Sequence, residues 1–207
     1  TKTCPDTGMA GASRSLYMDG NATIIAANKL LAAMRKEDGT LRTYDEMKAE
    51  GIETKYLGRY ETNTTPGLCR LDPNTGIGDP TPAFTYCLNL AEVEVDTKTG
   101  KTTVLKFTCV DFVGRIGNID AVNGQAYSGI MHGIGFALKE DYADVKKHAN
   151  MFGAGTSYIK DVPDDINLIH IDGAISDGPF GSSGASEAFQ ASGHCAVLNL
   201  SLIHISE

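Results

Sequence analysis

Residues 178–190 read Gly-Pro-Phe-Gly-Ser-Ser-Gly-Ala-Ser-Glu-Ala-Phe-Gln and set one carboxylate, Glu187, behind a run of mostly small residues. Small residues let the backbone approach another group closely, and a carboxylate held in a dry pocket can serve as a general base. The same carboxylate in the first turn of a helix would stabilise that helix through its dipole. The position of Glu187 in the sequence leaves both roles open.

Two other glycine-containing stretches could bind a ligand. Residues 8–14 end at a predicted helix start, where backbone N–H groups and the helix dipole favour a phosphate or another anion, although an ordinary helix cap explains the same composition. Gly124 and Gln125 lie near the start of a second predicted helix. The stretches lack the glycine-lysine pattern of a mononucleotide loop and the Gly-x-Gly-x-x-Gly pattern of a dinucleotide fold, so nucleotide-binding folds of those kinds have little support.

A nucleophile elbow is a third possibility, because residues 184–188 read Gly-Ala-Ser-Glu-Ala and approach the pattern Gly-x-Ser-x-Gly, with His194 available as a base. An elbow follows a buried strand, and the glycine- and proline-containing residues before Gly184 do not predict one. The last position of the pattern is also alanine instead of glycine. The sequence therefore disfavours a serine hydrolase built on Ser186 and His194.

The composition bounds the class of protein. The 207 residues are 42% hydrophobic and carry a net charge of −8 with scattered basic residues, so nucleic acid is not an expected partner. No apolar run reaches the roughly 18 residues that a membrane helix needs, and no signal-peptide pattern opens the sequence, so we expect a cytoplasmic protein that does not bind membranes. The five cysteines predict neither a disulfide framework nor a zinc or iron-sulfur site, and we expect them to be reduced and buried.

The first half of the chain predicts helices and a loop. Apolar residues recur at helical spacing from Ser15 to about Arg35, over a face wide enough to predict a buried helix. Thr43 and Glu46 have the spacing of a capping box, which predicts a short helix that runs to Gly51. Residues 58–82 are rich in glycine, proline, asparagine and threonine, and we expect a long surface loop there.

The second half predicts a hairpin and further helices. Residues 84–95 and 101–112 are β-rich runs joined by a short glycine-containing turn, with one wet and one packed face. Asp120 is the expected cap of a glycine-rich helix that runs to Leu138, residues 166–171 form a short β-run, and a helix broken at Gly193 follows Glu187 as far as Leu200. The predicted class is α+β, with mixed helices and a β-hairpin sheet.

The three glycine-containing stretches, in this order and at this spacing, resemble the C-terminal part of the molybdopterin-binding domain of molybdenum hydroxylases, the family of xanthine dehydrogenase and aldehyde oxidoreductase. The resemblance rests on residues 4–22, which open with Cys-Pro-Asp-Thr-Gly, on residues 123–135, which hold Asn-Gly-Gln and Gly-Ile-Gly, and on residues 178–187. It covers about residues 1–200 and is nearest to bacterial aldehyde oxidoreductases. Residues 201–207 have no counterpart in the family and are predicted to be a tail foreign to it.

The resemblance implies roles for particular residues. It implies that Glu187 is the catalytic base beside molybdenum, that Ala12 and Ala185 border the substrate pocket, and that Gln125 bonds the pterin. The residues implied to contact the cofactor are Gly11, Ala12, Ser13, Arg14, Gln125, Gly184 and Ser186. No protein side chain is implied to ligate the metal, because the dithiolene of the pterin does so. The chain departs from the family pattern at Ser186, Ala188, Phe189 and His132, so the resemblance does not determine the substrate.

The resemblance also implies a reaction and its partners. The family hydroxylates an aldehyde or an N-heterocycle with water as the oxygen source, using molybdopterin, here expected in the cytosine dinucleotide form, with 2Fe-2S clusters and in some members FAD elsewhere in the enzyme. It implies that this chain is a fragment of a larger enzyme, that iron-sulfur domains or subunits are its partners, and that the complete enzyme is a homo-oligomer or a heteromeric complex. A remnant module that binds no cofactor is the alternative.

Overall fold

The computed structural model describes residues 4–5, 7, 10–61, 72, 74–78, 81 and 83–205. Five α-helices and a three-stranded mixed sheet are present in this part of the chain, which confirms the predicted α+β class. The elements are α1 (Ser15–Met34), α2 (Tyr44–Ala49), β1 (Tyr86–Val95), β2 (Thr102–Phe112), α3 (Ile119–Leu138), α4 (Met151–Ala154), the 3₁₀ turn η1 (Ile159–Asp161), β3 (Asp165–His170), the 3₁₀ turn η2 (Pro179–Gly181) and α5 (Ser186–Ile205).

The sheet has the strand order β1-β2-β3, with β1 and β2 forming the predicted antiparallel hairpin and β3 lying parallel to β2. Asp96 closes the hairpin turn, since its carbonyl oxygen accepts from the amides of Thr99 and Gly100 at 3.2 and 2.7 Å. Gly100 has a φ of 72°, a left-handed conformation that suits glycine. The predicted β-run at residues 166–171 corresponds to β3.

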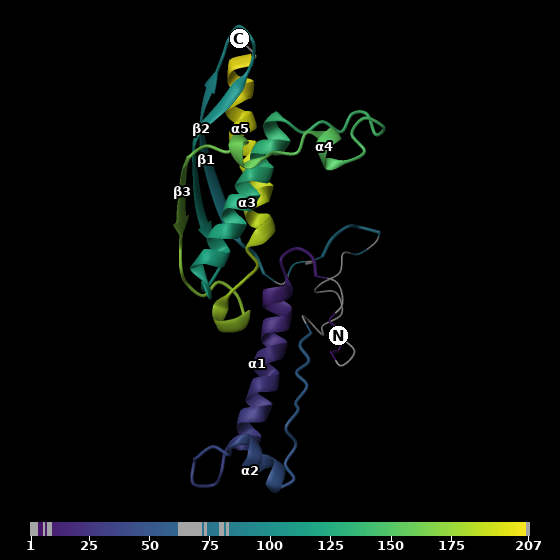
Figure 1. The fold of residues 1–207 in the computed structure, drawn as a ribbon, viewed down its shortest axis with the longest axis vertical. Coiled ribbons are helices and arrows are strands. Elements are labelled where there is room, and N and C mark those ends of the chain that lie inside the picture. Colours follow the sequence, from purple (N-terminus) through teal and green to yellow (C-terminus); the bar gives the residue numbers. More distant parts are fainter. Residues whose placement is uncertain are drawn as a thin grey trace.

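Helices α3 and α5 cover one face of the sheet (Figure 1). Every second residue of β1 and β2 faces these helices, because side chains alternate between the two faces of a strand. The core consists of Ala91, Val104, Phe107, Cys109, Val113, Ala126, Ile130, Ile134, Phe189 and Val197. The opposite face is open, and Tyr86, Leu88 and Leu90 are exposed on it. The prediction of one packed face is confirmed, but the other face is more apolar than Glu92 and Glu94 suggested.

Helices α3 and α5 run parallel and touch through glycines. A Cβ atom placed on Gly129 would lie 2.5 Å from the Cβ of Phe189, and one placed on Gly133 would lie 2.9 Å from the backbone nitrogen of His194. The helix backbones therefore approach more closely than any larger residue would permit. The predicted break of α5 at Gly193 is wrong: the helix is continuous there, and Gly193 packs against the Cα of Gly133.

Helix α1 has the predicted bounds but is not buried. It extends away from the sheet together with α2 (Figure 1), and Tyr17 is its one buried residue. Residues 52–61 run along α1 and cover part of its apolar face. Gly58 packs against Ala22, and Lys29 Nζ donates to the carbonyl oxygen of Leu57 at 2.8 Å. The capping box of Thr43 and Glu46 is present at the start of α2.

Other sequence predictions are corrected or fall outside the described residues. Asn118, not Asp120, caps α3, since its side chain accepts from the amide of Ala121 at 3.0 Å. Among the four cysteines described, Cys109 alone is buried, so the expectation that all are buried is wrong. Most of the loop predicted at residues 58–82 lies outside the described residues. No helix in the described part of the chain is long and apolar enough to cross a membrane.

We predict that Gly129→Ala destabilises the protein and that Gly124→Ala does not. The new methyl group of Gly129→Ala meets Phe189 at 2.5 Å, so α3 and α5 must separate, and the free energy of unfolding should fall by about 1–3 kcal/mol. Gly124 lies on the same helix with no atom within 4 Å of such a methyl group, and alanine there should raise the free energy by up to about 1 kcal/mol. Urea denaturation measures both. Equal effects would contradict the close packing.

Candidate functional site

The first and last predicted motifs meet at the start of α5. The hydroxyl of Ser13 accepts hydrogen bonds from the backbone amides of Ser186 and Glu187, at 3.0 and 3.2 Å, and donates its own hydrogen to Oε2 of Glu187. These residues are 173 and 174 positions apart in the sequence. Tertiary contact therefore brings together two segments that the sequence could only suggest were related.

The backbone around Ser13 is held in an uncommon conformation. Ala12 and Ser13 have φ angles of 52° and 53°, the left-handed region that residues other than glycine seldom adopt. Conformations of this kind cost roughly 1–3 kcal/mol each and persist where the surroundings fix them. The surroundings here include Gly184, because a Cβ on that residue would lie 2.6 Å from the carbonyl oxygen of Ser13. The fit of the two segments requires both the turn and the glycine.

Glu187 is exposed in this chain and has one oxygen atom in use. Its Oε2 accepts from Ser13, whereas Oε1 has no hydrogen-bond partner among the described residues. The carboxylate also lies in the first turn of α5, so both roles left open by the sequence are compatible with its position. The groups packed around Glu187 in this chain do not exclude water from it.

Gln125 lies on α3 near this place. It precedes Gly129 by one helical turn and therefore lies on the face of α3 that contacts α5. The two helices run parallel, and Gly129 contacts Phe189 in the first turn of α5. Gln125, one turn earlier on α3, therefore lies beside the N-terminal end of α5. Its side chain is exposed.

The remaining predicted residues lie close by in the sequence and structure. Ala12 and Arg14 are exposed, and Gly11 accepts through its carbonyl oxygen from the amide of Arg14 at 3.2 Å. Gly184 contacts Ser13 as described above. Ala185 packs partly against the core, so part of its surface serves the fold and not a pocket.

The structure excludes the serine hydrolase. Ser186 and His194 both lie on α5, about 12 Å apart along the helix axis at the usual rise per residue, so their side chains cannot exchange a hydrogen bond. Nε2 of His194 instead lies 3.4 Å from Sγ of Cys195, and no strand leads into Ser186. The elbow pattern arises from the small residues before a helix.

Residues 177–183 join the two halves of the molecule, a role that the sequence analysis missed. Asp177 accepts from the hydroxyl of Tyr17 through Oδ1 and from Nδ2 of Asn21 through its carbonyl oxygen, the latter at 3.1 Å. Burial, with the hydrogen bond to Asp177, raises the pKa of Tyr17. Spacing carried a signal for this contact, because Tyr17 and Asn21 are four residues apart and share one face of a helix.

The other end of this segment lies against the end of β2. The amide of Ser183 donates to the carbonyl oxygen of Val113 at 2.9 Å, and the hydroxyl of Ser182 donates to that of Arg115 at 2.6 Å. Gly114 has a φ of 86°, and a Cβ there would lie 2.5 Å from the carbonyl oxygen of Gly181. Residues 181–183 are therefore fixed against the end of β2, and they place residues 184–187 beside Ser13.

A second missed cluster supports the helix that carries Gln125. Nδ1 of His170 lies 2.5 Å from Oδ2 of Asp111, and its Nε2 lies 2.7 Å from Oδ1 of Asn123. The cluster joins β2, β3 and the first turns of α3. Burial raises the pKa of Asp111, and the contact with His170 opposes that rise. Oδ1 of Asp111 has no partner among the described residues.

An open cavity of about 670 Å³ is lined by residues including Lys101, Lys139 and Lys160 at the far end of α3, and it contains none of the predicted residues. Lys139 there is paired with Asp161 at 2.6 Å. We place the candidate site at Ser13 and Glu187, because a carboxylate on a fixed backbone, with one oxygen atom unbonded in the described part of the chain, can accept a proton, which an open surface hollow cannot do. No group of three or more His, Cys, Asp or Glu side chains suited to a metal ion occurs among the described residues.

Comparison with known proteins identifies relatives over nearly the whole chain. A family model described as the molybdopterin cofactor-binding domain matches residues 1–163. The chain is 42% identical over 199 residues to aldehyde oxidoreductase of Megalodesulfovibrio gigas, which covers 96% of this chain and 22% of the relative. The chain thus spans about a fifth of the length of that relative.

Solved structures of aldehyde oxidoreductases also resemble this chain. The aldehyde oxidoreductase from Desulfovibrio desulfuricans matches with a TM-score of 0.85 at 43% identity, over 94% of this chain and 21% of that one. The aldehyde oxidoreductase from Desulfovibrio gigas matches with a TM-score of 0.88 at 41% identity, over 96% of this chain and 22% of that one. The family model ends before Glu187, whereas both structural matches cover more of the chain than the model does.

We predict that His170→Ala destabilises the fold, because it leaves the carboxylate of Asp111 buried without its partner. The free energy of unfolding should fall by about 3–5 kcal/mol. The loss should grow as the pH rises through the pKa of Asp111, since the charged form carries the penalty. Adding Asp111→Asn should restore part of the loss in a double-mutant cycle, and strictly additive losses would show that the two side chains do not interact.

We also predict that Gly184→Ala opens the contact between Ser13 and α5. The added methyl group would lie 2.8 Å from Cβ of Ser13, so the two segments must move apart. Hydrogen exchange at the amides of Ser186 and Glu187 should quicken about tenfold or more, which equals about 1.4 kcal/mol of opening free energy. Gly117→Ala is the matched control, because nothing lies within 4 Å of its methyl group. Unchanged exchange in Gly184→Ala would refute the contact.

Proposed function

The chain belongs to the molybdenum hydroxylase family, within its molybdopterin cofactor-binding domain, and on that premise we propose that it supplies the base of an oxidative hydroxylation, with Glu187 as that base. One observation carries the proposal. A carboxylate stands where Ser13, the start of α5 and the glycine-rich segment meet; Oε2 is held, and Oε1 has no hydrogen-bond partner among the residues that the structure describes. A held carboxylate with one free oxygen is suited to accept a proton in a fixed direction.

The small and exposed residues at this place are compatible with a cofactor that approaches the backbone closely. Ala12 and Ser13 form a left-handed turn of small side chains, Gly184 lies against that turn, and the exposed amide of Gln125 is level with them on α3. Gly11, Ala12, Ser13, Arg14, Gln125, Gly184 and Ser186 are the residues that would contact the cofactor. When bound, molybdopterin with molybdenum would supply the oxidising centre, and water would be the source of the oxygen atom.

The chain's own residues would then perform a proton transfer. Oε1 of Glu187 accepts the proton that the hydroxylation releases, while the hydroxyl of Ser13 keeps Oε2 in place. Ala12 and Ala185 have only methyl groups as side chains, so they would leave room for a substrate beside the carboxylate. Because this chain leaves Glu187 exposed, residues from the rest of the enzyme would have to exclude water during the reaction.

An aldehyde is the substrate class that we propose. The support is the 42% identity to a relative named aldehyde oxidoreductase, which extends over 96% of this chain. A purine or another N-heterocycle is the alternative, since Ser186, Ala188, Phe189 and His132 depart from the usual family residues. We further propose the cytosine dinucleotide form of the cofactor, 2Fe-2S clusters or FAD in other parts of a cytoplasmic enzyme, and assembly with the domains or subunits that carry them.

The whole enzyme tests this proposal through Glu187→Gln. Glutamine keeps the size of the side chain and an oxygen that can accept from Ser13, but it cannot take the proton, so aldehyde-dependent dye reduction should fall by about 100-fold or more. Molybdenum content, measured by plasma mass spectrometry, should stay unchanged.

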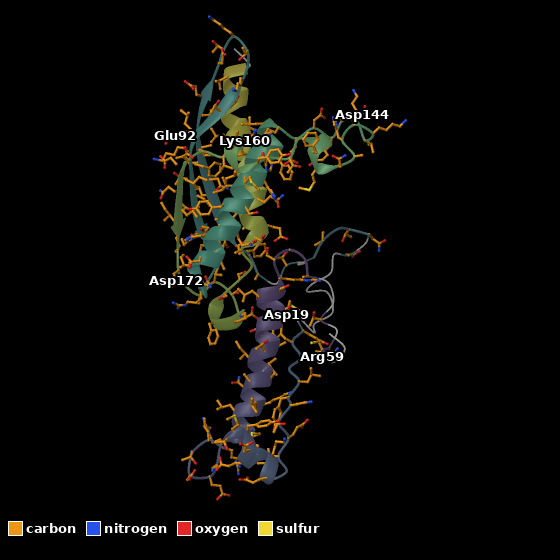
Figure 2. The ribbon with its side chains drawn as sticks, in the orientation of Figure 1. Asp19, Arg59, Glu92, Asp144, Lys160 and Asp172 are labelled. Atoms are coloured by element: carbon orange, nitrogen blue, oxygen red, sulfur yellow. The ribbon has the colours of Figure 1, made fainter. Side chains whose placement is uncertain are left out.

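Glu92→Gln is the control for this experiment, because Glu92 is an exposed carboxylate on β1, well away from α1 and the start of α5 (Figure 2). Its activity should equal that of the unmodified enzyme. Full activity in Glu187→Gln would refute the assignment of the base. An unmodified enzyme that holds no molybdenum would favour a remnant module without a cofactor.

A further inference from the structure

The first turn of α5 has no cap in its own sequence. A helix leaves its first N–H groups without partners inside the helix, and the residue before Ser186 usually supplies an acceptor from its side chain. That residue is Ala185, which has none. The acceptor comes from Ser13, whose hydroxyl oxygen lies 3.0 and 3.2 Å from the amide nitrogens of Ser186 and Glu187.

The hydroxyl of Ser13 also bonds the side chain of Glu187. A serine hydroxyl has one hydrogen to donate and two lone pairs to accept with. Both lone pairs serve the amides of α5, and the hydrogen serves Oε2 of Glu187. The side chain of Ser13 has no hydrogen-bonding capacity left for a cofactor, so any cofactor contact by Ser13 falls to its backbone.

We infer that Ser13 is a positioning residue for the base, an inference that rests on the proposed function of Glu187. Ser13 ties the backbone of Glu187 and the end of its side chain to the same oxygen atom. A glutamate side chain is otherwise free to turn about several bonds, and an exposed one has little packing to stop it. With Oε2 fixed, Oε1 is the atom that remains to accept a proton.

The backbone around Ser13 explains why this residue can reach α5. Its φ of 53° follows that of Ala12 at 52°, and the turn that results faces Gly184, which has no side chain to keep Ser13 away. A left-handed conformation at two successive residues other than glycine is strained, and it persists where the surrounding structure fixes it. The turn therefore places the hydroxyl of Ser13 at the start of α5.

Ser13→Ala in the whole enzyme tests the inference. The substitution keeps the backbone and removes only the hydroxyl, so kcat should fall by about 10- to 100-fold through loss of orientation, while KM stays within about threefold. Molybdenum content should not change. Ser13→Asn should recover part of kcat, because an amide can both accept from the α5 backbone and donate to Glu187, and asparagine tolerates a positive φ.

Thr43→Ala separates positioning from stability. Thr43 caps α2 and forms the same kind of hydroxyl-to-backbone bond, so its loss lowers the stability of the fold without changing the site. Its kcat should equal that of the unmodified enzyme. A Ser13→Ala enzyme that matches Thr43→Ala in kcat would overturn the inference. Loss of molybdenum from Ser13→Ala would also overturn it, since Ser13 would then retain the cofactor.

The double variant Ser13→Ala/Glu187→Gln distinguishes failure of this inference from failure of the proposed function. If Ser13 acts through Glu187, the double variant should be no slower than Glu187→Gln alone, and a further independent loss would overturn the inference. A fully active Glu187→Gln enzyme would overturn the proposed function together with the inference. A fully active Ser13→Ala enzyme beside an inactive Glu187→Gln enzyme would overturn the inference alone.

Discussion

The amides at the start of α5 need an acceptor, and the structure takes it from residue 13 and not from residue 185. These hydrogen bonds join the half of the molecule that contains α1 to the half that contains the sheet. Hydrogen bonds from Tyr17 and Asn21 to Asp177 also join the two halves. The orientation of Glu187 follows from this one junction.

Glycine decides how closely the segments approach elsewhere. Gly129 and Gly133 set the distance between α3 and α5, Gly184 admits Ser13, and Gly114 lets the end of β2 pair with residues 181–183. Each contact is one that a single methyl group would open. The 23 glycines of the chain weaken its helices in isolation, and the positions described here show what the protein gains from that cost.

Large parts of the surface are apolar and open. The face of the sheet that carries Leu88 and Leu90 is exposed, α1 has little cover, and the carboxylate of Glu187 faces solvent. The chain spans about a fifth of the length of its aldehyde oxidoreductase relatives, which agrees with a domain that presents several faces. Within the proposed function, the dryness that a base needs would come from outside this chain.

Local patterns in the sequence determined most of the elements. Helical periodicity located α1, the capping box located α2, and alternation with a turn located the hairpin, because each of these depends on residues that are close in sequence. The same local logic failed at Gly193, where contact with Gly133 outweighs low helix propensity, and at α1, whose exposure depends on what lies beside it.

The motifs named the residues of the candidate site, but only the tertiary structure related them. No local pattern connects Ser13 with Glu187 or His170 with Asp111, since these pairs lie far apart in sequence and meet through the packing of whole elements. The sequence by itself indicated a turn of small residues at 11–14 and a carboxylate, Glu187, behind a glycine-rich segment. The tertiary structure alone places the hydroxyl of Ser13 against Glu187. Only three-dimensional packing can bring a side chain from residue 13 to the uncapped amides at residues 186 and 187.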